Sequence, residues 1–155
     1  MLSQNQQIAH AGSVSTKAAG QASNLPRWRN GNLYVTIQSM SYQIKELLLD
    51  DGDSPFAEWF GSLEAIAAAK VRVAVSRMEQ GNLSNVEWFR GIGEYKIDWG
   101  PGLRIYLAKD GLKIIILIGG GTKKRQQQDI DQAVALWEDY KRRKASTRKG
   151  KRTWH

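Results

Sequence analysis

Two short runs of alternating apolar and polar residues, Glu94–Trp99 and Leu103–Ala108, carry the side chains that could do chemistry. Such alternation is typical of strands with one buried face, and Gly100–Gly102 between the runs is typical of a hairpin turn. We expect the buried face to consist of Tyr95, Ile97, Trp99, Leu103, Ile105 and Leu107. The opposite, open face would then carry Lys96, Asp98, Arg104 and Tyr106.

A three-residue turn sets the expected register of this hairpin. It pairs Asp98 with Arg104 and Lys96 with Tyr106 on the open face. A slip by one residue would carry Lys96 and Arg104 into the core, so the choice of faces is strongly specified. We therefore expect two cations and a phenol side by side in solvent, where they suit phosphate binding and base stacking.

More cations follow the next apolar run. Leu112–Ile118 is almost entirely apolar, as expected of a central strand that is covered on both faces. The chain then leaves this strand through Gly119–Gly121 and enters a group of three cations, Lys123, Lys124 and Arg125. We expect this group at the rim of the open face.

Several catalytic chemistries lack the residues that they need. There is no cysteine, and the two histidines, His10 and His155, lie near opposite ends of the chain. Asp129 and Asp131 are two positions apart on a predicted helix and do not face each other, so we expect no metal or other cofactor. Gly119–Lys123 lacks the hydroxyl residue that follows the lysine of a phosphate loop. Phosphodiester cleavage without a metal or a histidine remains.

Two interpretations of the open face remain. In the first, Lys96 takes a proton from a ribose 2′-OH and Arg104 stabilises charge on the phosphate. A lysine base at neutral pH needs a pKa well below its ordinary value of about 10.4, and neighbouring cations could lower it. In the second, Asp98 and Arg104 form an ordinary cross-strand ion pair, and Lys96 and Tyr106 are solvated strand residues.

The wider pattern predicts a small α+β domain. Tyr42–Leu49 reads as an N-terminal edge strand. Ser54–Pro55 marks the start of one helix, and Ser62 caps a second helix that ends at Gly81. Gln126–Arg143 has the apolar stripe of a C-terminal helix. We expect the helical hairpin and the last helix on one face of a mainly antiparallel sheet.

Composition divides the chain into three parts. Residues 1–39 look like a disordered extension, residues 40–143 form the patterned domain, and residues 144–155 form a frayed basic tail. Met40 could be the native start. Residues 123–155 hold eleven Lys or Arg and four Asp or Glu, in a chain of net charge +8. This positive field suggests nucleic acid or an acidic protein surface as a partner, or serves solubility alone.

Targeting signals are absent from the pattern. No apolar run reaches the ~18 residues of a membrane span. The N-terminus lacks the apolar middle of a secretory signal. We expect a cytoplasmic protein with no membrane partner.

An ordered set of short motifs spans Tyr42 to Arg143. The motifs are Ser54-Pro55-Phe56-x-x-Trp59, Gly93-Glu94-Tyr95-Lys96-Ile97, Gly100-Pro101-Gly102-Leu103-Arg104-Ile105-Tyr106, Leu117-x-Gly119-Gly120 and Gln128-Asp129-Ile130-x-x-Ala133. In these motifs the sequence resembles the phage-derived, HigB-type branch of the RelE/ParE toxins, the killer proteins of type II toxin–antitoxin modules. The resemblance implies a RelE-like fold and an endoribonuclease that cleaves mRNA, usually in the ribosomal A site.

The resemblance also implies roles for particular positions. Lys96 and Arg104 match catalytic residues on the strands of the family. The family's cation after the last strand falls within Lys123–Arg125, where we take Lys124 as catalytic and Lys123 and Arg125 as RNA-binding. Tyr106 matches an aromatic residue that could stack on a base. In addition, the basic run of Lys141, Arg142 and Arg143 would add salt-dependent affinity for RNA.

The resemblance further implies partners. They are a cognate antitoxin, expected to be a small helix-turn-helix protein, together with mRNA and the ribosome. Two other functions stay open at this point. The ParE branch shares the fold but inhibits DNA gyrase, and a non-catalytic remnant of the fold would bind nucleic acid without cleaving it.

Overall fold

The computed structural model describes residues 27–29, 32–34 and 40–151. The chain divides into two units, Met1–Gln38 and Ser39–His155. In the first unit, β1 (Arg27–Arg29) and β2 (Asn32–Tyr34) form an antiparallel pair. The rest of the extension predicted at 1–39, and with it the prediction of disorder, lies outside the described residues.

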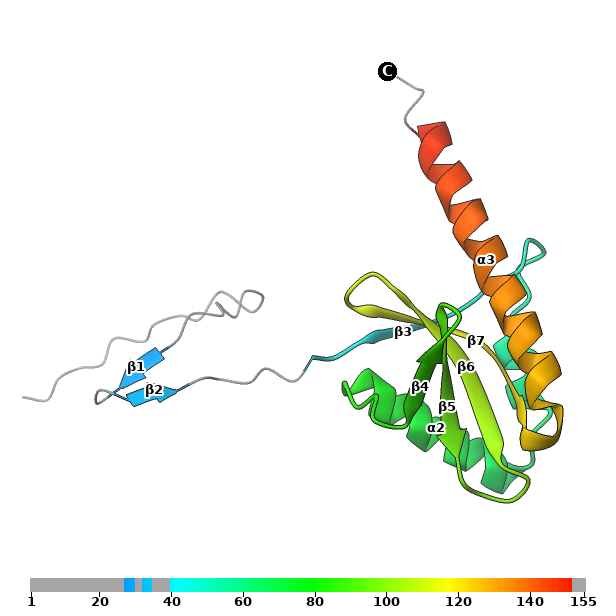
Figure 1. The fold of residues 1–155 in the computed structure, drawn as a ribbon, viewed down its shortest axis with the longest axis horizontal. Helices are drawn as coiled ribbons and strands as arrows, with labels where there is room; N and C mark the ends of the chain where they lie inside the picture. Colours follow the sequence, from blue (N-terminus) through cyan, green and yellow to red (C-terminus); the bar gives the residue numbers. More distant parts are fainter. Residues whose placement is uncertain (1–26, 30–31, 35–39, 152–155) are drawn as a thin grey trace, which may run out of the picture. The chain divides into compact units, whose positions relative to one another are not determined.

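The second unit is an α+β domain with a five-stranded mixed sheet and three α-helices (Figure 1). Its elements are β3 (Gln43–Glu46), α1 (Pro55–Gly61), α2 (Ala65–Glu79), β4 (Val86–Phe89), β5 (Ile92–Ile97), β6 (Leu103–Asp110), β7 (Ile114–Thr122), the short 3₁₀-helix η1 (Lys123–Arg125) and α3 (Gln126–Lys151). The strand order is β3-β7-β6-β5-β4. Only the β3–β7 pair is parallel, so the predictions of an N-terminal edge strand and a mainly antiparallel sheet are confirmed.

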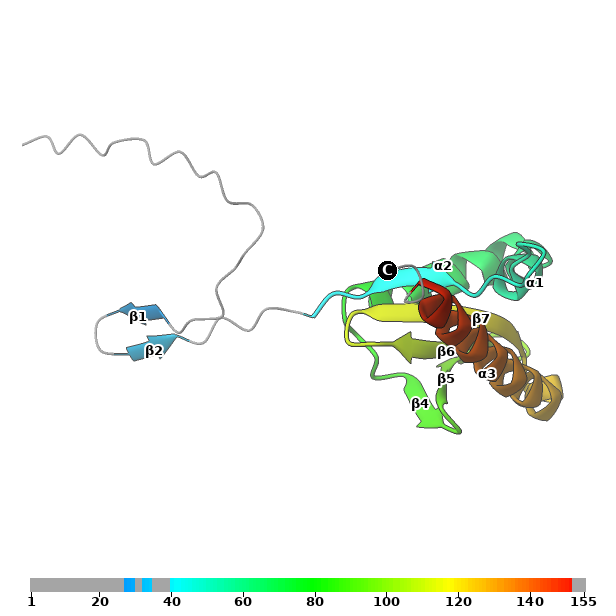
Figure 2. The same ribbon diagram turned by 90° about the horizontal axis from the view of Figure 1, so that it is seen from above.

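Helices cover both faces of the sheet, and the prediction of helices on one face is wrong (Figure 2). On one face, α1 and α2 bury Phe56, Ala67, Val71, Ala74 and Met78 against Tyr95, Leu103, Ile105, Leu107, Ile115 and Leu117. On the other face, α3 buries Ile130, Ala133 and Trp137 against Tyr106, Ala108, Ile116 and Ile118. The physical reason is the apolar β7, which exposes a hydrophobic side chain to each face and so needs a layer on both.

The helical hairpin begins as predicted but joins differently. Ser54 caps α1, since its Oγ accepts the Ala57 N–H at 3.0 Å. Ser62 does not cap α2, which contradicts the prediction. Its hydroxyl instead donates to the Trp59 carbonyl at 2.6 Å and closes α1. At the far end of α2, Gly81 has φ 92° and ends the helix as predicted.

The register of the β5–β6 hairpin differs from the prediction by two residues. Lys96 pairs with Arg104, and Glu94 pairs with Tyr106. Because the shift is even, every side chain stays on the predicted side of the sheet. The second side is nevertheless not an open face, because α3 covers it and buries both Arg104 and Tyr106.

A longer loop explains the shift. The predicted three-residue turn is part of a loop from Asp98 to Gly102, in which the Gly102 N–H donates to the Trp99 carbonyl at 3.0 Å. Gly100 and Gly102 have φ of 54° and 76°, a conformation that favours glycine. Asp98 therefore lies in the loop, and the predicted cross-strand pair of Asp98 with Arg104 is wrong.

Strand β7 changes character along its length. Beside β6 it has a bulge, because Tyr106 pairs with Gly119 while Leu107 pairs with Leu117. On its other side the β3 ladder ends where Glu46 pairs with Leu117. From Ile118 onward, β7 therefore has no β3 residue beside it in the described sheet, and α1 and α3 flank this edge.

The C-terminal helix is longer than predicted. It continues past Arg143 to Lys151, so residues 144–151 are helical rather than a frayed tail. Arg143 ties the helix to the turn after β3, since its guanidinium donates to the Leu48 carbonyl at 2.9 Å and pairs with Asp50 at 3.3 Å. Among the described residues, no helix is both long enough and apolar enough to cross a membrane.

Candidate functional site

A buried carboxylate organises the predicted catalytic residues. Glu94 is 1% exposed, and its Oε1 accepts an N–H of Gln126 at 2.7 Å. Arg104 Nε lies 3.7 Å from the same oxygen, and Lys96 Nζ lies 3.8 Å from Oε2. Lys96 and Arg104, the two cations predicted on the strands, thus both lie beside Glu94. Glu94 was not among the residues predicted for the site.

Tyr106 cannot stack on a base from this position. Its side chain is 1% exposed beneath α3, and its hydroxyl donates to Glu94 Oε1 at 3.4 Å. Burial, followed by the negative charge of Glu94, raises the pKa of the Tyr106 phenol. The prediction of an exposed stacking residue is wrong, because it did not foresee the helix that covers this face.

The surroundings of Lys96 raise its pKa, whereas a lysine that acts as a general base at neutral pH requires a lowered pKa. Its Nζ donates to Glu87 Oε2 at 2.5 Å, and this bond raises the pKa of Lys96 above its ordinary value. The neighbouring Arg104 lowers the pKa only as a smaller contribution. Lys96 is therefore a protonated cation at neutral pH, suited to binding an anion rather than to accepting a proton.

A shallow depression lies beside Arg104 at the end of the β5–β6 hairpin. It is lined by residues 98–102, Arg104 and Lys123, with a volume of about 410 Å³. The Lys123 N–H donates to the Gly102 carbonyl at 2.9 Å, which fixes η1 against the loop. We call Lys96, Arg104 and Lys123 the cationic cluster. Three different elements supply these charges, as expected of an anion site.

The other two cations of η1 diverge from this depression. Lys124 is exposed, and it lines neither the depression beside Arg104 nor the pocket described next. Arg125 points to the opposite side of β7, where it lines the pocket between α1 and α3. The 3₁₀ geometry, with three residues per turn, separates the directions of successive side chains and so divides the group.

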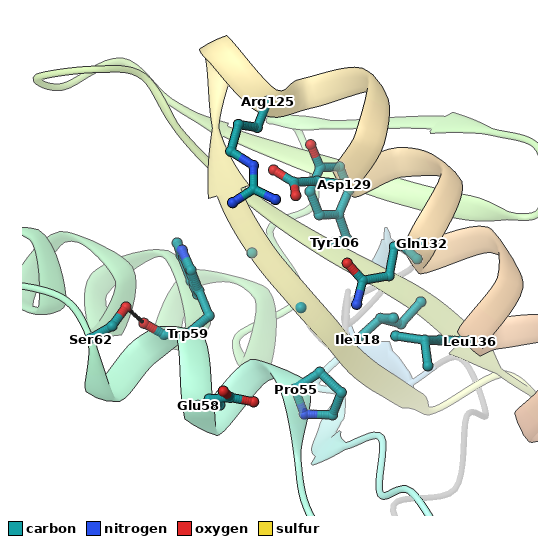
Figure 3. A pocket seen from close by; sticks show the side chains of 13 residues that line it. Pro55, Glu58, Trp59, Ser62, Tyr106, Ile118, Arg125, Asp129, Gln132 and Leu136 are labelled. Atoms are coloured by element: carbon teal, nitrogen blue, oxygen red, sulfur yellow. Dashed lines mark hydrogen bonds between the residues drawn. The ribbon is translucent and has the colours of Figure 1, made fainter.

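That pocket encloses about 340 Å³ across the uncovered edge of β7 (Figure 3). Its polar lining includes Glu58, Arg125, Asp129 and Gln132, and its apolar lining includes Trp59, Ile118 and Leu136. The backbone of Gly119 and Gly120 also borders it. Tyr106 lines the pocket as well and therefore joins it to Glu94.

Asp129 is the unusual polar residue of this pocket. Its Oδ2 is buried without a hydrogen-bond partner and packs against Gly121, where a Cβ would lie 2.0 Å from it. Burial raises the pKa of the Asp129 carboxyl, and the nearby Arg125 partly offsets the shift. Asp131 points elsewhere and pairs with Arg90 at 2.7 Å, so the two acids do not face each other, as predicted.

The basic run on α3 lies far from the cationic cluster. Lys141 is 15 residues from Gln126, or about 22 Å along a helix. Lys141 pairs with Glu138 at 2.7 Å, and Arg142 pairs with Asp139 at 2.8 Å. Arg143 binds the same Asp139 at 2.8 Å, besides its contacts to the turn after β3. These three residues are not part of the site around Arg104.

Sequence reasoning missed three polar residues of the site, Glu94, Gln126 and Asp129. One signal for Glu94 was available, because strand alternation places it on the same side as Lys96. Asp129 and Gln126 carried no comparable signal. Their contacts depend on how α3 crosses the sheet, and the helical pattern alone does not set that crossing.

Comparison with known proteins finds one informative relative. It is described as an uncharacterized protein of Haemophilus influenzae and is 34% identical over 102 residues. The alignment covers 64% of this chain and 97% of the relative. No protein-family model matches the chain, and no solved structure matches it.

Proposed function

The chain belongs to the same family as the Haemophilus influenzae protein, and we propose that it is the toxin of a type II toxin–antitoxin module. The proposed activity is that of a metal-independent endoribonuclease that cleaves ribosome-bound mRNA and so inhibits translation. The proposal includes a RelE-like fold and a cognate antitoxin partner. The description of the relative names no activity, so support comes from the site.

One observation carries the proposal: Arg104 and Lys123 line one depression at the end of the sheet, and Lys96 pairs with Arg104 on the neighbouring strand. Lys96 comes from β5, Arg104 from β6, and Lys123 from η1. Lys96 and Arg104 are directly paired across the strands, although like charges in such a pair repel each other. Glu94 offsets this repulsion from below. Such an arrangement suits a phosphodiester, whose negative charge would lie over the cluster.

In the proposed reaction a ribose 2′-OH attacks the adjacent phosphate and gives its proton to water, and the 5′-oxygen of the next nucleotide leaves with a proton taken from water. Arg104 stabilises the charge that develops on the phosphate. Its guanidinium is held by Glu94 and lines the depression. Lys96 and Lys123 hold the substrate phosphates as protonated cations. Lys96 does not take part in proton transfer in this proposal, because its pKa is raised.

Induction of the full chain without its antitoxin tests the proposal. We expect growth arrest and new 5′ ends within mRNA, mapped across the transcriptome. Arg104→Lys should lower the cleavage rate about a hundredfold, because it removes the donors that fit the phosphate while keeping a positive charge beside Glu94. Arg142→Lys is the matched control, since Arg142 is exposed on α3 and binds Asp139.

Thermal unfolding of both variants serves as the folding control. DNA damage signalling without new mRNA 5′ ends would contradict the nuclease and indicate the gyrase inhibitor instead. Equal cleavage by Arg104→Lys and by Arg142→Lys would exclude the site proposed here. RNA binding without cleavage or growth arrest would indicate the non-catalytic remnant.

A further inference from the structure

The pocket between α1 and α3 has a shape and a lining that the proposed cleavage site does not use. We propose that it is a nucleobase pocket, which binds one base of the RNA substrate and prefers a base with an exocyclic amino group. The choice of RNA as the ligand rests on the proposed function. The pocket itself stands on its own geometry.

The pocket is large enough and polar enough to be a binding site. Its volume of about 340 Å³ lies within the range of small-molecule sites. Apolar side chains of Trp59, Ile118 and Leu136 line it together with a few polar groups. A flat base with hydrogen-bonding edges matches such a mixture of walls.

Gly119 keeps the floor of the pocket open. Its φ is not positive, and a Cβ built on it would meet nothing within 4 Å. Neither the backbone conformation nor a close approach therefore requires glycine here, and glycine weakens a strand interior. The bulge beside Tyr106 places Gly119 in this position, and bulges often occur next to functional sites. Glycine at position 119 therefore leaves open a part of the pocket that a side chain would fill.

Asp129 indicates the kind of base. A carboxylate accepts hydrogen bonds and donates none when ionised. Adenine, cytosine and guanine each carry an exocyclic amino donor, whereas uracil has none, and its single N3–H donor lies between two carbonyl oxygens. The Asp129 carboxylate would attract the amino group and repel the uracil carbonyls. Burial also raises the pKa of this carboxyl, so a ligand donor beside it would favour the charged form.

Two neighbours connect the pocket to an RNA chain. Arg125 lines the pocket, and its guanidinium can bind a phosphate next to the bound base. Tyr106 lies between the pocket and Glu94, which holds Arg104. The pocket and the cationic cluster are thus linked inside the fold through Tyr106 and Glu94. A base in the pocket and a phosphate at the cationic cluster would belong to the same RNA chain.

Calorimetric titration of the full chain with AMP, GMP, CMP and UMP tests the proposal. We expect the three amino-bearing nucleotides to bind about tenfold more tightly than UMP, because a carboxylate left facing a carbonyl is a strong discriminator. Asp129→Asn should remove this difference, since an amide can turn a donor toward uracil. Equal affinities for all four nucleotides in the native chain would overturn the proposal.

A second pair of variants separates the pocket from the rest of the fold. Gly119→Val should abolish binding of all four nucleotides, because the valine fills open space in a regular strand. Gly61→Val is the matched control, as Gly61 also has no atom within 4 Å of its Cβ position and does not line the pocket. Unchanged binding by Gly119→Val would exclude the pocket.

Cleavage assays distinguish this proposal from the proposed function. Selective nucleotide binding by a chain that does not cleave RNA would support the pocket and contradict the nuclease. RNA cleavage at the same positions and rates by Gly119→Val and by the native chain would support the nuclease and contradict the pocket.

Discussion

The two faces of the sheet differ in the types of residue that they bury. The face beneath α1 and α2 is an apolar core, in which Val71, Ile105 and Leu107 are fully buried. The face beneath α3 has an apolar part around Trp137, but it also buries Glu94 and Arg104. The same two strands, β5 and β6, supply side chains to both faces.

This difference indicates which face is structural and which is functional. Among the described residues, two buried side-chain atoms lack a hydrogen-bond partner, Arg104 Nε and Asp129 Oδ2. Both lie on the α3 side, at the end of β7. Unsatisfied buried polar groups destabilise a fold, so their presence calls for an explanation, and a binding or catalytic role is a common one. The apolar face supplies the stability that this arrangement gives up.

Truncation of the apolar face should have the largest effect on stability. Ile105 is 0% exposed between Tyr95 on β5 and the helices. Ile105→Ala should lower the free energy of unfolding by about 4 kcal/mol, because it removes buried methyl groups and leaves a cavity. Urea denaturation measures the change.

Ile105→Val is the graded control for this prediction, and its cost should be about 1 kcal/mol. Similar, small losses in both variants would show that the apolar face is loosely packed. Neither variant should alter the nucleotide preference of the native chain, because Ile105 points away from the α3 side.

Loss of the buried acid should have the next largest effect. Glu94→Ala leaves the Arg104 guanidinium buried without its counter-ion, and we expect a loss of about 3 kcal/mol in urea denaturation. The paired substitution Glu94→Leu with Arg104→Met should recover most of this loss, because it removes both charges and keeps the volume. A double variant as unstable as the sum of the single variants Glu94→Leu and Arg104→Met would show that the ion pair does not couple the two residues.

Strand alternation was sufficient to predict the two sides of the β5–β6 hairpin. The side-chain period of a strand is two, so Ile105 and Arg104 were assigned to opposite faces whatever the exact partners. The partners themselves depend on the length of the loop. The two glycines at 100 and 102 permit a tight turn inside a longer loop, and a sequence pattern does not distinguish this from a three-residue turn.

The covering of the α3 face could not be predicted in the same way. The apolar stripe of the last helix shows that it packs against something, but not which face of the sheet it meets. A strand face that carries Lys96, Arg104 and Tyr106 is predicted to be solvent-exposed when the helix that packs against it is unknown. Glu94 and Gln126 satisfy part of this row only after the helix is in place.

Substitution of Asp129 by asparagine should have the smallest effect on stability. Unlike the two changes above, it should stabilise the protein. Burial raises the pKa of its carboxyl in the folded state, so the folded protein binds this proton more tightly than the unfolded chain does. The charged form is therefore destabilising above the folded pKa, and the penalty disappears as the pH falls below the unfolded value. Asp129→Asn should stabilise the protein at pH 7 by up to about 1 kcal/mol.

This gain should shrink toward zero in acid, which thermal unfolding across a pH series can follow. Asp131→Asn is the matched control, because Arg90 lowers the pKa of Asp131 and the loss of that carboxylate should destabilise the protein at neutral pH. A destabilised Asp129→Asn at pH 7 would mean that the carboxylate makes a favourable contact in the folded state. A variant that is more stable but has lost the nucleotide preference would show directly that the α3 side gives up stability for binding.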